Sequence, residues 1–326
     1  MPDRKPKVVV TRKLPAPIEA RMGELFDATL NPDDRPMSLE ALAEAMETAD
    51  VLAPTVTDRI DARLIERAGE RLKLIANVGA GVDHIDVEAA SARGITVTNT
   101  PGVLTETTAD MAFALLLAAA RRLPEAERAV RDGAWGPWHP TWLLGREVSG
   151  STLGIIGAGR IGAAVARRAA GFGMRVFYYS RAVHPDFPGE YAGLDALLSE
   201  SHFVSVHVPL TPETERMCNA DWFAKMRPDA VFVNTSRGGV VDQQALRAAL
   251  ERGTIAAAAL DVTTPEPLPP DDPLLRAPNL VVVPHLGSAT ERTRTAMAAL
   301  AVDNLLAALA GERPQNLVNA EAWERR

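Results

Sequence analysis

The sequence is poor in cysteine, since Cys218 is the only one among 326 residues. A single cysteine cannot form an internal disulfide, and the chain contains no cluster of cysteines with metal-ligand spacing. We therefore expect no bound metal and, by default, a reducing cytosolic location.

Long apolar runs and an excess of basic residues are also missing. The longest apolar run, Met111–Ala120, is too short to cross a bilayer. The stretch Met1–Lys7 is charged and lacks the apolar segment of a signal peptide. The formal net charge is −7, whereas phosphate backbones require a basic face. We expect neither a membrane nor a nucleic acid as partner.

What is present is typical of a globular enzyme: 47% of the residues are hydrophobic and 24% are charged. A length of 326 residues predicts two domains. Strand-like and helix-like segments alternate, which predicts βαβ units and parallel sheets. The expected strands are Lys7–Val10, Val51–Ala53, Leu72–Ala76, Ile95–Thr98, Arg175–Tyr179, Phe203–Val206, Ala230–Asn234, Ile255–Asp261 and Leu280–Val283. One long helical stretch, from about Glu106 to Arg131, separates the two series.

The glycine-rich stretch Gly157–Gly162 lies between an apolar strand, Leu153–Ile156, and a helix, Ala163–Ala170. This context is typical of a dinucleotide site. The first glycine makes the tight turn, Gly159 lets the backbone approach a pyrophosphate, and the last lets helix and strand pack closely. Amide groups at the start of the helix then face the phosphates. The alternative is a glycine-rich turn without a ligand.

Because the glycine loop begins in the middle of the chain, the first hundred residues form a separate domain. We predict an α/β fold with two doubly wound parallel-sheet domains. Residues 1–100 and 289–326 form a flavodoxin-like substrate domain, and residues 101–288 form an inserted Rossmann dinucleotide domain. The chain crosses between them near Pro101 and Pro284, and the final helix, Thr290–Ala310, belongs to the first domain by this division.

Three polar residues each follow the carboxyl end of a predicted strand: Arg237, Glu266 and His285. Ligands bind at that edge of doubly wound sheets. An imidazolium can give a proton to a carbonyl, a carboxylate can hold the imidazole, and a guanidinium can bind a substrate carboxylate. The alternative for each residue alone is an ordinary solvated or structural side chain.

The residues after the strand Arg175–Tyr179 bear on the choice of cofactor. NAD-dependent enzymes of this fold place an acidic residue there to bond the ribose 2′-hydroxyl. Here Ser180 and Arg181 stand in that position, and the next acid is Asp186. A hydroxyl and a guanidinium can bind a 2′-phosphate, so we expect NADP to be preferred and NAD to be accepted. The alternative is that Arg181 is solvated and the enzyme does not discriminate.

Six motifs together resemble the D-2-hydroxyacid dehydrogenases, and within them the glyoxylate/hydroxypyruvate reductase branch. These motifs are Asn77–Asp86, Gly157–Gly162, His207–Thr211, Asn234–Gly239, Asp261–Pro269 and Pro284–Thr290. The resemblance covers nearly all of the chain. Many family members have Phe at one position of the Asp261–Pro269 motif. This chain has Thr263 there, and in this it resembles the reductase branch.

The resemblance implies reduction of small 2-oxo acids, glyoxylate to glycolate and hydroxypyruvate to D-glycerate, with His285 as the proton donor. The catalytic set of the family falls on Arg237, Glu266 and His285. Besides the residues already named, the resemblance implies cofactor contacts at Arg160, Ile161, Val208, Pro209, Thr214, Thr235, Asp261 and Gly287.

The resemblance also gives Asn77–Gly81 a role. The amide groups of Val78 and Gly79 would receive the substrate carboxylate, as backbone anion-binding nests do. The alternative is an ordinary turn in which Asp83 or Asp86 caps a helix.

Three of the five Trp residues lie in Gly133–Trp142. The family dimerises through this region, so the resemblance implies a homodimer in which Trp142 reaches the partner's active site. Core packing within one chain is the alternative.

Other functions fit the same fold. One is a non-catalytic dinucleotide-binding regulator; another is a dehydrogenase for a different 2-oxo acid. Phosphoglycerate oxidation is not expected, because it usually brings a carboxy-terminal regulatory domain.

Overall fold

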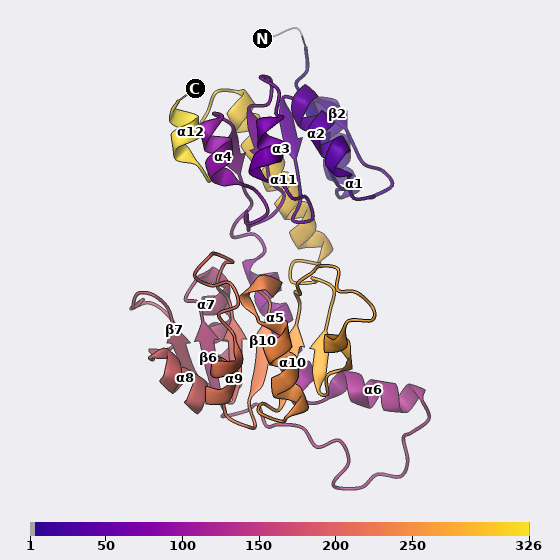
Figure 1. Cartoon of the computed structure of the whole chain (residues 1–326), viewed down its shortest axis with the longest axis vertical. Helices are drawn as coiled ribbons and strands as arrows, with labels where there is room; N and C mark the ends of the chain where they lie inside the picture. Colours follow the sequence, from indigo (N-terminus) through magenta and orange to yellow (C-terminus); the bar gives the residue numbers. More distant parts are fainter. Residues whose placement is uncertain (1–3, 326) are drawn as a thin grey trace. The chain divides into compact units, whose positions relative to one another are not determined.

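The computed structural model describes residues 4–325, which form two compact units. Unit 1 contains the described residues up to Leu104 and those from Thr290 onward, and unit 2 is Thr105–Ala289 (Figure 1). These bounds lie within four residues of the domain limits expected from the sequence. That each unit is a functional domain stays a prediction.

Unit 1 is built on a five-stranded sheet in the order β2-β1-β3-β4-β5, with every neighbouring pair parallel. This is the flavodoxin-like order. Its elements are β1 (Lys7–Val10), α1 (Ala16–Leu25), β2 (Asp27–Thr29), α2 (Leu39–Thr48), β3 (Val51–Ala53), α3 (Ala62–Glu66), β4 (Leu74–Ala76), α4 (Val87–Ala92), β5 (Thr96–Thr98), α11 (Glu291–Leu309) and α12 (Ala320–Glu324).

The two faces of this sheet carry two separate apolar clusters, as expected for a parallel sheet that is covered on both sides. Helices α2, α3 and α4 contribute to one cluster. On the other face, Val8 and Leu74 of the sheet pack with Ala298, Val302 and Leu305 of α11. The last long helix therefore belongs to unit 1, although nearly two hundred residues separate it from the rest of that unit.

Unit 2 is built on a seven-stranded parallel sheet in the order β8-β7-β6-β9-β10-β11-β12. The order reverses between β6 and β9, as in dinucleotide-binding sheets, so the predicted fold class is confirmed. Its elements are α5 (Thr105–Ala120), α6 (Leu123–Arg131), β6 (Thr152–Ile156), α7 (Arg160–Ala170), β7 (Arg175–Tyr179), β8 (Glu190–Tyr191), α8 (Leu194–Glu200), β9 (Phe203–Val206), α9 (Ala220–Lys225), β10 (Val231–Asn234), η1 (Gly238–Val240), α10 (Gln243–Glu251), β11 (Ala257–Leu260), η2 (Pro273–Arg276) and β12 (Leu280–Val282).

The long helical stretch expected from about Glu106 to Arg131 is present, but it consists of two helices, because a break separates α5 from α6. Arg122 adopts a left-handed conformation, with φ of 53°. Pro124 has no N–H for a continuing helix, and its ring would clash with the carbonyl group four residues earlier. That carbonyl, of Ala120, instead accepts a hydrogen bond from the amide of Arg146 at 2.7 Å.

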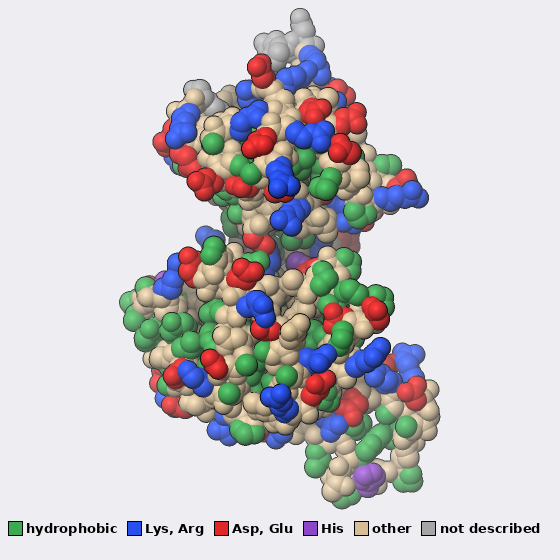
Figure 2. Space-filling view, in the orientation of Figure 1, with side chains coloured by type: hydrophobic (Ala, Val, Ile, Leu, Met, Phe, Trp, Pro, Cys, Tyr) green, Lys and Arg blue, Asp and Glu red, His purple; other side chains and the backbone are tan. Residues whose placement is uncertain are grey.

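Helix α6 and the loop after it project from the body of unit 2 (Figure 1). No residue from 121 to 147 is buried, and Figure 2 shows hydrophobic side chains on the surface of this projection. Trp135 is 66% exposed, Trp138 85% and Trp142 37%. Core packing of these three side chains within the chain is therefore excluded. Within the described residues, no helix is both long enough and apolar enough to span a membrane.

Candidate active site

The glycine loop joins β6 to α7 at the point where the strand order of unit 2 reverses. Gly157 has φ of +105°, and a Cβ atom there would lie 2.6 Å from the carbonyl oxygen of His207. A Cβ atom on Gly162 would lie 2.3 Å from the carbonyl oxygen of Gly157. Both positions therefore require glycine, one for its conformation and both for close packing. A Cβ atom on Gly159 would meet only open space.

The start of α7 fits a pyrophosphate group. Gly159 is the N-cap and supplies no side-chain hydrogen bond, so the amide groups of the first turn, which includes Arg160 and Ile161, have no capping partner. Amide groups at a helix start are a ready anion site. Thr235, at the carboxyl end of β10, adds a second observation: its hydroxyl is buried and has no hydrogen-bond partner among the described residues. The site thus offers unsatisfied donors of the type that a dinucleotide binds.

Arg237 lies in a turn that Asn234 organises. Asn234 is fully buried at the end of β10, and its side-chain amide donates to the carbonyl of Arg237 at 2.9 Å. Its Oδ1 accepts from the amide and the hydroxyl of Ser236, at 2.9 and 2.8 Å. The guanidinium of Arg237 donates from Nη1 to the carbonyl of Ser236 at 2.9 Å. A buried amide therefore sets the conformation from which the arginine emerges.

A direct hydrogen bond joins Glu266 Oε1 to His285 Nδ1. They follow β11 and β12, which are neighbours in the sheet, and β10 with its Arg237 turn is next along. The structure thus places all three predicted catalytic residues at the carboxyl ends of adjacent strands. With Nδ1 engaged by the carboxylate, Nε2 is the imidazole nitrogen left to face a substrate.

Gln243 holds the loop that carries Glu266, and sequence reasoning missed it. Its side chain donates from Nε2 to the carbonyl of Thr264 at 2.7 Å and accepts from the amide of Thr264 at 2.8 Å. Gln243 begins α10, where a polar residue is unremarkable, so no signal in the sequence could have identified this contact. The paired hydrogen bonds fix the loop two residues before the carboxylate of Glu266.

Asp261, predicted as a cofactor contact, clamps the loop that carries His285. Its backbone carbonyl accepts from the amide of His285 at 2.8 Å. Its carboxylate accepts from the amides of Leu286 at 2.5 Å and Gly287 at 2.8 Å. Asp261 is only 2% exposed, and His285 adopts a left-handed conformation with φ of 53°. Three hydrogen bonds to one residue therefore stabilise an unfavourable backbone conformation at the imidazole.

Burial raises the pKa of Asp261, and the negative charge of Glu266 acts in the same direction. The amides of Leu286 and Gly287 and the charge of His285 oppose the shift without cancelling it. The carboxylate is therefore held in a site where its charge is costly, which is typical of residues at functional sites.

The other predicted cofactor contacts lie in three places. Val208 and Pro209 follow β9, and the Thr214 hydroxyl donates to the carbonyl of Pro209 at 2.6 Å. Ser180 follows β7, where its hydroxyl donates to the carbonyl of Ala182 at 2.5 Å. Arg181 is exposed. Gly287 is buried beside Asp261, and a Cβ atom there would lie 2.9 Å from Asp261 Oδ2. Their contacts with a cofactor stay a prediction.

The predicted anion nest lies in unit 1, directly after β4. Asn77 is buried and donates from Nδ2 to the carbonyls of Gly79 at 3.0 Å and Gly81 at 2.9 Å. The amide of Val78 donates to the carbonyl of Pro54 at 2.9 Å. That N–H is therefore already engaged within unit 1, and a contact between Val78 and the substrate carboxylate stays a prediction. Among the described residues, no such hydrogen bond ties the amide of Gly79. Asp86 caps α4, so part of this stretch does serve a helix start.

Comparisons with known proteins agree with this geometry. The family model for the NAD-binding domain of D-isomer specific 2-hydroxyacid dehydrogenases matches residues 113–287. A glyoxylate reductase from Korarchaeum cryptofilum is 52% identical over 322 residues, which cover 97% of each chain.

Two solved structures are similar over almost the whole chain. A protein from Thermus thermophilus has a TM-score of 0.90 and 50% identity, covering 96% of this chain and all of that one. An NADPH-dependent glyoxylate/hydroxypyruvate reductase from Sinorhizobium meliloti, in complex with NADP and malonate, has a TM-score of 0.85 and 36% identity, covering 98% of both chains.

Proposed function

Because the chain belongs to the D-isomer specific 2-hydroxyacid dehydrogenase family, we propose that it reduces glyoxylate to glycolate and hydroxypyruvate to D-glycerate, with NADPH as the preferred cofactor. The chain is an NAD(P)-dependent oxidoreductase, so a non-catalytic regulator is no longer an alternative. The names of the relatives support the choice of substrates. The observation on which the proposal rests is the hydrogen bond between Glu266 and His285.

In this proposal each residue of the candidate site has its own chemical role. When bound, the reduced nicotinamide supplies the hydride. His285 gives a proton from Nε2 to the carbonyl oxygen, while Glu266 holds the ring in place through Nδ1. Arg237 pairs with the substrate carboxylate, as a fork that matches its two oxygens. In unit 1, the amide of Gly79 keeps its predicted role as a donor to a carboxylate.

The test of the proton donor compares His285→Ala with Glu266→Gln. We expect His285→Ala to lower kcat for hydroxypyruvate by about 10²–10⁴-fold, the usual scale of general acid catalysis, without weakening NADPH binding. Glu266→Gln keeps a hydrogen-bond acceptor for Nδ1 but removes the charge, so a smaller loss is expected. Chiral analysis of the glycerate should find the D enantiomer. A His285→Ala enzyme with wild-type kcat would remove His285 from the mechanism.

The cofactor preference is proposed from the absence of an acid after β7. Ser180 and Arg181 occupy the position from which an acid would bond the ribose 2′-hydroxyl and repel a 2′-phosphate. Glu213 lies near enough to Arg181 to sense its charge: a hydrogen bond from Thr211 and the Glu213 amide lower the pKa of the Glu213 carboxyl, and the charge of Arg181 adds to the shift. A 2′-phosphate would therefore compete with Glu213 for this guanidinium.

Two variants test this preference in opposite directions. Ser180→Asp places a negative charge beside the 2′-phosphate and should raise KM for NADPH by at least about tenfold, because like charges in contact cost several kcal/mol. Glu213→Gln removes the competitor of the phosphate and should lower KM for NADPH while leaving KM for NADH unchanged. A wild-type enzyme with higher kcat/KM for NADH than for NADPH would refute the assignment.

We also propose a homodimer formed through the projecting segment of residues 121–147. The exposed indoles of Trp135, Trp138 and Trp142 are the type of aromatic surface that protein interfaces bury. In this proposal Trp142 reaches the partner's substrate site. Light scattering at micromolar concentration should give the mass of two chains for the wild type, and Trp138→Ala should weaken the dimer. A monomeric wild type would exclude this arrangement.

A further inference from the structure

The side chain of Gln243 bonds to both backbone groups of one residue in the loop that carries Glu266. Gln243 is the first residue of α10; its Nε2 donates to the carbonyl of Thr264 at 2.7 Å, and its Oε1 accepts from the amide of Thr264 at 2.8 Å. A primary amide carries both a donor and an acceptor, so it can satisfy the N–H and the C=O of one residue together. Gln243 therefore fixes the backbone of Thr264 at two points.

The loop around Glu266 is exposed and rich in proline. Residues 264–267 are all exposed, so apolar packing contributes little to their position. Four of the eight residues from 263 to 270 are proline, and these lack the N–H group that a regular ladder of hydrogen bonds requires. Hydrogen bonds to other elements therefore matter more for this loop than they do for a packed segment.

The backbone on both sides of Gln243 is firmly held. Asp242 is the N-cap of α10, and its carboxylate accepts from the amides of Gln244 and Ala245, both at 3.1 Å. The amide of Asp242 donates to the carbonyl of Cys218 at 3.1 Å. A capped helix start resists fraying. Gln243 is thus a fixed support for the exposed loop.

The turn that carries Arg237 contacts the same loop. Gly238 directly follows Arg237, and a Cβ atom on Gly238 would lie 2.0 Å from both the carbonyl carbon and the carbonyl oxygen of Thr263. The two backbones are therefore in contact at a distance that only glycine allows. One short segment, residues 237–243, thus carries Arg237 and also holds the residues that precede Glu266.

We propose that Gln243 is a positioning residue, which acts through Thr264 to hold Glu266 in place. With that support the carboxylate meets the imidazole of His285, and its loop keeps its contact with the Arg237 turn. The inference rests on the proposed function, in which Glu266 holds the imidazole. Hydrogen bonds weaken steeply with distance and angle, so a loop released from Gln243 would loosen the bond between Glu266 and His285.

Hydrogen exchange of the full chain, read by mass spectrometry, detects this support directly. Residues 263–270 carry only four backbone N–H groups, on Thr263, Thr264, Glu266 and Leu268, because the other four residues are proline. Gln243→Leu keeps the approximate size of the side chain but removes its donor and its acceptor. In this variant we expect the Thr264 amide to exchange at least about tenfold faster, because its protection comes from the lost hydrogen bond.

Gln244 offers a matched control, because it is the next residue, has the same side chain and is exposed. Gln244→Leu should leave both the exchange of residues 263–270 and kcat unchanged.

Steady-state kinetics show whether the support acts through Glu266. Gln243→Leu should lower kcat for hydroxypyruvate by about 10- to 100-fold, the scale of a displacement of up to about 1 Å at a reacting group. KM for NADPH should not change, because the glycine loop is untouched. In a chain that already carries Glu266→Ala, the same substitution should change kcat by less than about twofold, since the group that Gln243 positions is absent.

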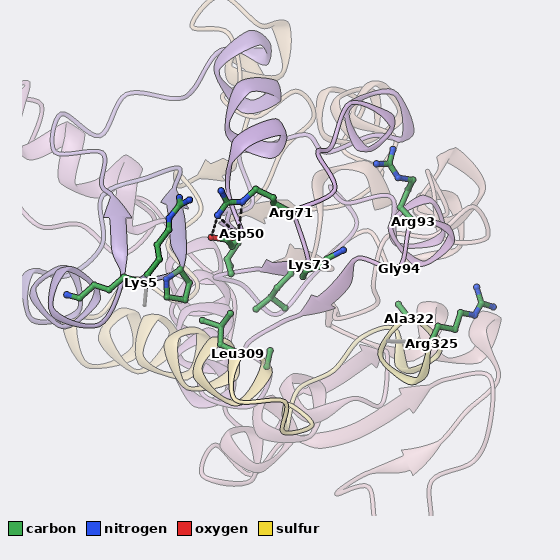
Figure 3. A pocket seen from close by; sticks show the side chains of 14 residues that line it. Lys5, Asp50, Arg71, Lys73, Arg93, Gly94, Leu309, Ala322 and Arg325 are labelled. Atoms are coloured by element: carbon green, nitrogen blue, oxygen red, sulfur yellow. Dashed lines mark hydrogen bonds and ion pairs between the residues drawn. The ribbon is translucent and has the colours of Figure 1, made fainter. Parts of the chain in front are cut away.

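A second control separates positioning from stability. In the wall of a cavity of unit 1, Arg71 donates to the two carboxylate oxygens of Asp50 at 2.8 and 2.9 Å (Figure 3). Like the contact between Gln243 and Thr264, this one joins two segments by more than one hydrogen bond. Arg71→Leu removes it and should lower Tm by a few degrees without changing kcat. A similar fall in Tm therefore does not explain a loss of kcat in Gln243→Leu.

Three results would overturn the inference: unchanged exchange of the Thr264 amide in Gln243→Leu, wild-type kcat in that variant, or the same loss of kcat with and without Glu266. Wild-type kcat in Glu266→Ala would instead refute the proposed role of Glu266, and the inference would fail with it. Because hydrogen exchange does not depend on activity, these two failures can be told apart.

Discussion

Replacement of Asp261 tests the idea that one buried carboxylate holds the loop that carries His285. Asp261→Ala leaves the amides of Leu286 and Gly287 without their acceptors. An unsatisfied buried donor costs about 1–3 kcal/mol, so two cost about 2–6 kcal/mol in the free energy of unfolding. The loss is partly offset, because burying the carboxylate charge is itself unfavourable. Asp261→Asn retains one acceptor and should lose about half as much.

Activity should fall together with stability. His285 relies on Asp261 for its left-handed conformation, and a displacement of about 1 Å at a reacting group can cost about 10²-fold in rate. We expect Asp261→Ala to lower kcat by about 10²-fold while KM for NADPH changes less. Steady-state kinetics and urea unfolding on the same preparations measure both quantities.

The pH dependence of stability has a definite sign. The pKa of Asp261 is raised in the folded chain from its ordinary value of 3.8. The group therefore contributes stability that is fully present below pH 3.8 and is lost as the pH rises through the folded value. Relative to Asp261→Asn, the wild type should gain stability as the pH falls from 7 toward 4.

Asp229 provides a control of opposite sign. The hydrogen bond from Arg227 lowers the pKa of Asp229, so its contribution is lost as the pH falls. Relative to Asp229→Asn, the wild type should therefore lose stability toward low pH, with kcat unchanged. An Asp261→Ala enzyme with wild-type kcat, or the same pH trend in both comparisons, would refute the role assigned to Asp261.

Two further substitutions follow from the geometry of unit 2. Arg237→Lys should lower kcat/KM for glyoxylate by about tenfold or more, because an ammonium cannot reproduce a two-point contact with a carboxylate; unchanged kcat/KM would remove Arg237 from the substrate site. Gly162→Ala places a Cβ atom 2.3 Å from the carbonyl oxygen of Gly157. Because this contact is too close, α7 must move, so KM for NADPH should rise with little change in the kcat reached at saturation. Fluorescence titration with NADPH checks the second, and wild-type affinity would contradict it.

The central strands of both sheets could be predicted from the sequence because they are short, buried and rich in β-branched residues. The strand at one edge of each sheet could not. β2 (Asp27–Thr29) and β8 (Glu190–Tyr191) contain no buried residue, so no apolar run in the sequence indicates either strand. The break between α5 and α6 was missed because Leu, Ala and Arg favour helix on both sides of it, although Pro124 was a usable signal.

The functional site was predictable where a motif is local and unpredictable where a contact is tertiary. The glycine loop and the positions of Glu266 and His285 after strands follow from residues close together in sequence. The pairing of Gln243 with Thr264, and the hydrogen bond that engages the amide of Val78 with Pro54, depend on segments that meet only in the fold. Local patterns therefore pointed to the candidate site, but they did not show which of its groups are already engaged in hydrogen bonds.

The return of α11 to unit 1 has a consequence for biosynthesis. A ribosome completes the first hundred residues long before it makes Ala298, Val302 and Leu305, which cover one face of the unit 1 sheet. Unit 2 is continuous in the chain and can fold as it emerges. The nascent sheet of unit 1 must instead keep Val8 and Leu74 uncovered until the last helix leaves the exit tunnel. The enzyme is therefore most exposed to aggregation and to chaperone capture during the synthesis of its second half, when the unit 1 sheet is not yet covered by α11.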